Sequence, residues 1–155
     1  MIENNELQEL IPHRGKMLLI TRVNTYDVKE MRLSAEYDIT SDCIFFDPVI
    51  GAVPSWTGFE FIAQAISVLS GIRNRELGIK PRIGFILSIQ YMKMEIPLFK
   101  PGSRVEIRVK QNDATDLIYT FTGEAFLEGK KAIEGKLMVM EINEENYGNL
   151  CRGAD

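Results

Sequence analysis

The sequence has few of the residues that build metal centres and redox sites. Among its 155 residues are two cysteines, Cys43 and Cys151, a single histidine, His13, and a single tryptophan, Trp56. The cysteines lie far apart and form no C-x-x-C or Cys/His spacing, which indicates neither a zinc site nor a disulfide framework. We therefore expect no metal and no cofactor, and a reducing cytoplasm is the simplest compartment.

Concentrated positive charge and long apolar runs are also missing. Lys and Arg total 18 against 22 Asp and Glu, with no dense basic run, so nucleic acid is not expected as a partner. The most apolar stretch, residues 59–72, is shorter than the ~20 residues that span a membrane and contains Glu60 and Gln64. The polar, acidic start of the chain lacks the features of a secretory signal. We expect no membrane partner and no export.

The composition is that of an ordinary globular protein. Hydrophobic residues make up 45% of the chain and charged residues 26%, which is enough apolar material for one core. A chain of this length leaves no room for a second full domain. We expect a single domain over residues 1–155, with a short tail from about residue 144.

The order of predicted elements favours an α+β fold. The expected elements are a short helix over 5–11, strands over 17–26 and 31–37, a long helix from Ser55 or Thr57 to Leu77, and strands over 82–94, 104–111, 117–127 and 131–142. A long helix followed by four consecutive strands must pack on an antiparallel sheet.

The long helix is apolar on nearly every side, so it should be buried almost all round. Glu60, Gln64, Ser67 and Gly71 interrupt the apolar surface at intervals of three or four residues, with Ser70 beside them. Residues at that spacing lie on one line of a helix. The sequence therefore predicts a narrow polar seam along a buried helix.

Several segments resemble the β-hydroxyacyl-[acyl carrier protein] dehydratases of the hotdog superfamily. Residues 10–23, LIPHRGKMLLITRV, are similar to that family's opening stretch, and Pro48, Pro54, Glu60 and residues 63–65 fall at the spacing of its loop and helix start. Residues 53–65, 81–87 and 97–102 resemble a divergent branch found in bacterial aryl-polyene and related fatty-acid-like synthesis.

The resemblance implies a hotdog fold, with a long central apolar helix wrapped by an antiparallel sheet of about five to six strands. It also implies a protein that acts on or binds 3-hydroxyacyl thioesters, linked to acyl carrier protein or coenzyme A. In relatives, the acyl chain occupies a tunnel at a dimer interface, where a loop histidine and a helix carboxylate come from opposite subunits. We therefore expect a homodimer, or a heterodimer with a second hotdog subunit.

The chain matches only half of the catalytic pair. Dehydration needs one group that removes an α-proton and one that protonates the departing hydroxyl. Glu60 matches the family's carboxylate, but Phe46 stands where the family has its histidine. The base would then be Asp47, or His13 through an unusual fold of the N-terminus, or a residue of another protein. A histidine-bearing hotdog partner is our preferred hypothesis.

Other readings of these residues stay open. Thr57-x-x-Glu60 is also a capping box, in which Glu60 would bond back to the start of the helix. Residues expected to line an acyl site are Phe46, Gly51, Pro54, Trp56, Gln64 and Phe85. For the aromatic residues, core packing is the alternative. Gln64 would orient Glu60 or bond to backbone groups rather than react. For the whole protein, the alternatives are a non-catalytic acyl-binding subunit and an acyl thioesterase whose helix carboxylate activates water.

Overall fold

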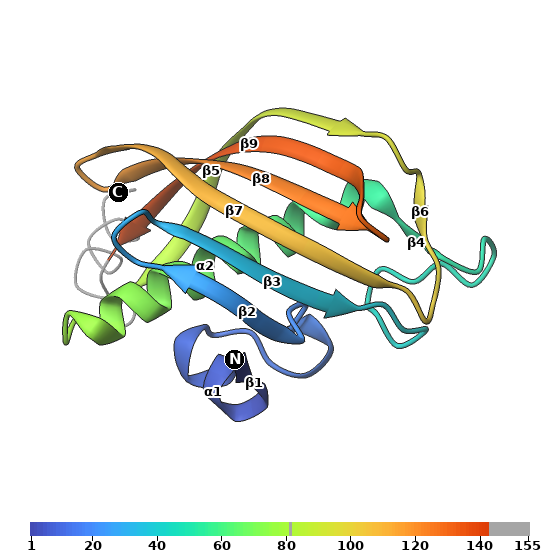
Figure 1. The fold of residues 1–155 in the computed structure, drawn as a ribbon, viewed down its shortest axis with the longest axis horizontal. Helices are drawn as coiled ribbons and strands as arrows, with labels where there is room; N and C mark the ends of the chain where they lie inside the picture. The colour runs from blue at the N-terminus through green and yellow to red at the C-terminus, as the bar shows by residue number, and fades with distance from the viewer. Residues whose placement is uncertain (81, 143–155) are drawn as a thin grey trace, which may run out of the picture.

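The computed structural model describes residues 1–80 and 82–142, and it consists of a curved antiparallel sheet wrapped around one long helix (Figure 1). The helix, α2, spans Gly58–Glu76. The sheet has the strand order β1-β2-β3-β7-β8-β9-β5, and every neighbouring pair is antiparallel. This arrangement confirms the predicted α+β fold with a central apolar helix.

The remaining elements have the following bounds: β1 Ile2–Glu3, α1 Asn4–Leu10, β2 Arg22–Asp27, β3 Arg32–Asp38, β4 Val53–Pro54, β5 Ile83–Met94, β6 Leu98–Phe99, β7 Arg104–Thr115, β8 Ile118–Leu127 and β9 Lys130–Ile142. The sheet has seven strands rather than five to six, because the first residues of the chain add β1 beside β2. Strands β4 and β6 form a separate two-stranded sheet. The tail expected from about residue 144 lies outside the described residues.

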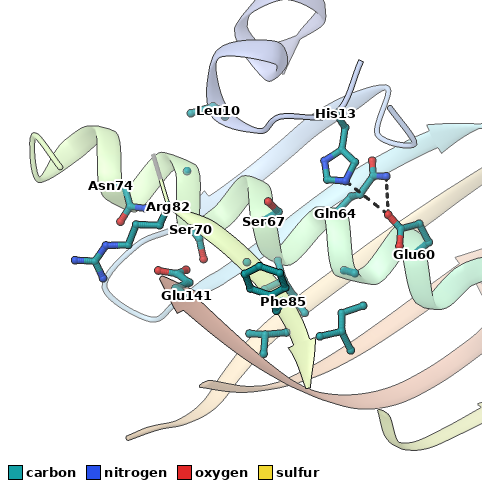
Figure 2. A pocket seen from close by; sticks show the side chains of 16 residues that line it. Leu10, His13, Glu60, Gln64, Ser67, Ser70, Asn74, Arg82, Phe85 and Glu141 are labelled. Atoms are coloured by element: carbon teal, nitrogen blue, oxygen red, sulfur yellow. Dashed lines mark hydrogen bonds and ion pairs between the residues drawn. The ribbon is translucent and has the colours of Figure 1, made fainter. Parts of the chain in front are cut away.

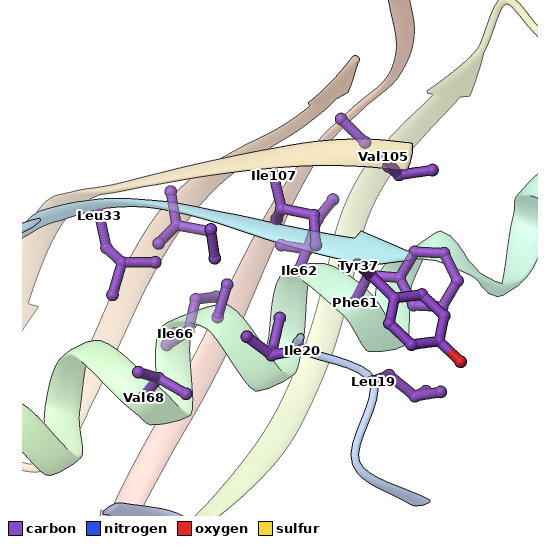
Figure 3. Close-up of a cluster of buried hydrophobic side chains, with 14 of the residues drawn as sticks. Leu19, Ile20, Leu33, Tyr37, Phe61, Ile62, Ile66, Val68, Val105 and Ile107 are labelled. Carbon is purple, nitrogen blue, oxygen red and sulfur yellow. The ribbon is translucent and has the colours of Figure 1, made fainter. Parts of the chain in front are cut away.

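The core lies between α2 and the inner face of the sheet (Figure 3). On β3, the alternate residues Leu33, Ala35 and Tyr37 are buried in this core. The ring of Phe61 on α2 packs against the ring of Tyr37, with centroids 5.1 Å apart. Because most of its side chains are buried, α2 is fixed in position, and so are the few polar groups that it carries.

An ion-pair network on the outer face ties β2, β3 and β7 together. The strand register places Arg22 opposite Glu36, and Asp38 opposite Arg104. Arg22 donates to Glu36 and to Asp38 at 2.7 Å each, and Arg104 donates to Asp38 at 2.6 Å. Two arginines and two carboxylates thus form one connected cluster, named here the outer-face ion network.

Strand β5 forms one edge of the sheet and is apolar on its exposed surface. Among the residues that the structure describes, it pairs with β9 alone, and it is last in the strand order. Exposed apolar residues on it are Ile83, Phe85, Ile86, Leu87, Ile89, Tyr91 and Met94. Such an edge is a template for pairing with another chain. Within the described ranges, no helix has the length and apolarity needed to cross a membrane.

Candidate active site along the polar seam of the central helix

A cavity of about 150 Å³ runs along the polar seam of α2 (Figure 2). Its helix wall is formed by Glu60, Gln64, Ser67, Ser70, Gly71 and Asn74. The N-terminal segment forms a second wall, and Phe85 of β5 and Val139 of β9 lie on the opposite side. All four residues of the predicted seam, together with Ser70 beside them, therefore line one cavity.

Gln64 connects the helix to the N-terminal segment. Its Nε2 donates to Glu60 Oε1 at 2.9 Å and to the carbonyl of Met17 at 2.8 Å. Its Oε1 accepts a hydrogen bond from the backbone N–H of Leu19 at 2.8 Å. Because the side chain is buried, each of these bonds matters for stability. Gln64 thus bonds both to the Glu60 carboxylate and to backbone groups, so it orients Glu60 and also holds the N-terminal segment.

The structure brings His13 to Glu60. The His13 Nε2 lies 3.8 Å from Glu60 Oε1, and the two side chains are 26% and 20% exposed. Figure 2 shows both side chains at the same end of the cavity. Burial lowers the pKa of His13 below its ordinary value; the Glu60 charge opposes this shift and the Arg14 charge adds to it. His13 is therefore an uncharged imidazole at neutral pH, the form that can accept a proton.

The capping-box reading of Glu60 is wrong. Thr57 has helical backbone angles and makes no side-chain bond to the helix start. Its hydroxyl instead donates to the carbonyl of Pro54 at 2.7 Å. Because a short 3₁₀ turn over Ser55–Thr57 leads directly into α2, the helix needs no capping side chain at Thr57. The Glu60 carboxylate faces the cavity instead.

Five of the residues considered in the sequence do not line this cavity. They are Phe46, Asp47, Gly51, Pro54 and Trp56, all on the long connection between β3 and α2. Asp47 stabilises a turn by accepting the N–H of Val49 at 2.8 Å. Trp56 is 56% exposed, with its ring 6.5 Å from that of Phe45. Of the nine residues proposed as catalytic or acyl-binding, the cavity brings together Glu60, His13, Gln64 and Phe85.

The opposite end of the cavity holds polar groups that the sequence reasoning missed. Arg73 donates to Glu141 at 2.6 Å and to the Asn74 side-chain oxygen at 3.2 Å. Asn74 and Glu141 are buried and line the cavity. Arg73 and Glu141 are 68 residues apart, so no local pattern could have predicted this pair. In the part of the chain that the structure describes, no three His, Cys, Asp or Glu side chains gather as metal ligands would.

Comparison with known proteins gives consistent matches over most of the chain. The model of a family described as ApeP-like, ApeP dehydratase, matches residues 5–149. A 3-hydroxyacyl-[acyl-carrier-protein] dehydratase FabZ from Anaeromyxobacter dehalogenans is 29% identical over 142 residues, or 90% of each chain. A FabZ from Campylobacter hominis is 29% identical over 148 residues, covering 93% of this chain and 100% of that one.

Solved structures confirm the hotdog fold. The dehydratase heterocomplex ApeI:P from Xenorhabdus doucetiae superposes with a TM-score of 0.85 at 23% identity, covering 94% of this chain and 96% of that chain. Because the two sequences are only 23% identical, this similarity shows a shared fold alone. It agrees with the long helix and the seven-stranded antiparallel sheet described above.

Proposed function

The chain belongs to the ApeP-like dehydratase family, and from this premise we propose that it takes part in dehydrating 3-hydroxyacyl thioesters carried by acyl carrier protein or coenzyme A. The setting would be fatty-acid or polyene synthesis in the cytoplasm. The observation that carries the proposal is the placement of His13 beside Glu60 inside one cavity.

The pair supplies both groups that the reaction needs. The uncharged His13 imidazole takes the proton from the α-carbon, and the Glu60 carboxylate accepts that proton from the imidazolium and passes it to the hydroxyl at C3. The C3–O bond breaks, water leaves, and a double bond forms between the α- and β-carbons. His13 and Glu60 lie 3.8 Å apart, close enough for a small side-chain movement to bring them into hydrogen-bond reach for this transfer, and both end the reaction in their starting forms.

The cavity also suits a thioester with an acyl chain. Ala63, Ile66 and Phe85 give it apolar surface, while the His13–Glu60 pair lies at one end. A mostly apolar cavity with a few placed polar groups is the usual character of a small-molecule site. The acyl chain would lie along α2, with its reactive carbons at the Glu60 end.

A composite site is the second candidate, and two observations favour it. Phe46 occupies the family's histidine position, and its loop does not line the cavity of its own chain. The exposed edge of β5 offers a place for a second hotdog chain to join the sheet. In this version Glu60 would work with a histidine supplied by that partner.

One assay separates these possibilities. The purified chain is incubated with a 3-hydroxyacyl-carrier protein, alone and with a histidine-bearing hotdog protein, while enoyl product and free thiol are followed. For the His13–Glu60 pair, we expect both His13→Ala and Glu60→Gln to reduce enoyl formation ~100-fold or more, the scale of acid–base catalysis. Arg32→Gln, an exposed change on β3, serves as the matched control.

The other possible results of this assay would favour different functions. Activity that needs the partner and Glu60 but survives His13→Ala would favour the composite site. Release of thiol without enoyl product would favour a thioesterase, and acyl binding without turnover would favour a non-catalytic subunit. Full activity in Glu60→Gln would remove Glu60 from the mechanism.

A further inference from the structure

Arg14, the residue after His13, folds back onto the end of α1. Its Nη1 donates to the carbonyls of Ile11 at 2.6 Å and His13 at 2.8 Å, and its Nη2 donates to the carbonyl of Gln8 at 2.6 Å. The last carbonyls of a helix have no partner within the helix. The Arg14 guanidinium therefore closes the turn that carries His13, using the fork geometry that arginine alone offers.

The segment around this turn is anchored on both sides. Before it, the carbonyl of Leu10 lies directly over Gly71 of α2, where a Cβ would collide with it. After it, Gln64 holds the backbone at Met17 and Leu19. Between these two anchors, the backbone from Ile11 to Lys16 is held largely by Arg14 and by the turn at Gly15–Met17.

We propose that Arg14 is a positioning residue that acts through His13, holding the imidazole at the cavity wall opposite Glu60. This inference rests on the proposed function, because it gives a role to the His13–Glu60 pair. Arg14 itself does not line the cavity, so it would not touch the acyl chain. Its effect on the reaction would come from where it places His13.

The charges around His13 make the proposal measurable. Glu60 faces it from α2, and Arg14 adjoins it within the loop. The other charged groups that line the cavity, Arg82 and Glu141, lie at the opposite end (Figure 2). Removing Glu60 and removing Arg14 should therefore move the pKa of His13 in opposite directions.

His13 is the only histidine in the chain, so its imidazole signal can be followed by proton NMR during a pH titration of the full-length, untagged protein. In the wild type we expect a pKa below the ordinary histidine value, because burial favours the uncharged ring. Glu60→Gln should lower the pKa further. Arg14→Gln should raise it, because a positive charge is lost and the turn opens to water.

Arg14→Lys shows whether Arg14 affects His13 by holding it in place or only through its positive charge. Lysine keeps the charge but cannot make the forked bonds to three carbonyls. If Arg14 positions His13, Arg14→Lys raises the pKa as well and lowers the kcat of enoyl formation ~10-fold or more, with KM little changed. Arg32→Gln, remote from the cavity, should change neither quantity.

The proposal is overturned if Arg14→Lys titrates like the wild type, whether or not Arg14→Gln shifts. Thermal unfolding identifies a variant that fails to fold, and the lysine variant, which keeps the charge and the side-chain stem, is the milder change. The titration needs no turnover. A shift in Arg14→Lys without any enzyme activity would therefore refute the proposed function while leaving the positioning role intact.

Discussion

At the scale of single residues, the site depends on how closely the N-terminal segment approaches α2. The carbonyl of Leu10 rests on Gly71, and Gln64 bonds to Met17 and Leu19. These contacts bring His13, the chain's only histidine, over the helix that carries Glu60. A pair of residues far apart in the sequence thus shares one cavity.

Gly71→Ala tests whether the close contact between the Leu10 carbonyl and α2 is required. Alanine is favoured over glycine in a helix by ~1 kcal/mol. The added Cβ would nevertheless collide with backbone at Leu10, which cannot move aside as a flexible side chain would. We expect the collision to dominate, with a net destabilisation of about 1–3 kcal/mol in urea denaturation and a rise in the pKa of His13 as its segment loosens.

Ser70→Ala is the matched control, since Ser70 is the neighbouring position on α2. It should be close to neutral. A Gly71→Ala protein as stable as the wild type, with an unchanged His13 titration, would mean that α1 is free to shift and that the close approach is not required.

Helical spacing predicted Glu60, Gln64, Ser67 and Gly71 correctly as one seam, because the period of an α-helix is fixed by its backbone. The partner of Glu60 had no such signal. His13 reaches it through a turn whose shape depends on the Arg14 side chain, and such long-range placement leaves no local periodicity. The Thr57-x-x-Glu60 spacing wrongly predicted a capping box. The 3₁₀ turn over Ser55–Thr57 runs directly into α2, so the helix start needs no capping side chain.

At the scale of elements, the outer-face ion network joins three strands and should respond to acid. Burial alone would raise the pKa of Glu36, but hydrogen bonds from Arg22 and Asn24, with the charge of Arg104, bring it below the ordinary value. The pKa of Asp38 is lowered in the same manner by Arg104 and Arg22. These carboxylates stabilise the fold above their unfolded pKa, and this stability is lost as pH falls through their lower folded pKa.

Glu36→Gln measures that contribution. We expect the variant to have a lower melting temperature than the wild type at pH 7, and the gap to narrow as pH falls below about 4.5, the region where an unfolded glutamate titrates. Glu30→Gln, at an exposed position in the turn between β2 and β3, is the control and should follow the wild type. A gap that stays constant from pH 7 to pH 3 would contradict the role given to the Glu36 charge.

Strand β3 was predictable because apolar and polar residues alternate along it. Strand β5 shows no such alternation of burial. The strand predicted from residue 17 begins at Arg22, because a short 3₁₀ turn over Gly15–Met17 precedes it. The two-residue strands β1, β4 and β6 were not predictable, since so few residues show no alternation. The long helix was predicted almost to its ends, at Gly58 and Glu76. What no pattern showed was that the first residues of the chain would extend the sheet beside β2.

At the scale of the whole molecule, the most prominent feature of the surface is the exposed apolar edge strand β5. Its apolar residues are exposed on a sheet edge that pairs with no strand among residues 1–80 and 82–142 other than β9. Natural edges of this length usually carry charge or a covering element. We therefore expect β5 to be covered by a second hotdog chain in solution.

Leu87→Lys tests this expectation by placing a charge in the middle of β5, where Leu87 is 45% exposed. Light scattering after size-exclusion chromatography should show a two-chain assembly for the wild type, and a shift towards single chains for the variant. Tyr26→Lys, an exposed position on β2 near the other side of the sheet, should leave the assembly unchanged. Wild-type protein that is monomeric alone and with hotdog partners would contradict the expectation.

The cavity also sets a condition on when this protein can first hold an acyl group. Its walls come from residue 13 near the beginning of the chain and from Val139 and Glu141 in the last strand described. A chain still being synthesised therefore has Glu60 on its helix but no closed space beside it until β9 has emerged and paired with β8 and β5. Premature termination before β9 would leave a polypeptide that carries both residues of the proposed acid–base pair but lacks the cavity that encloses them.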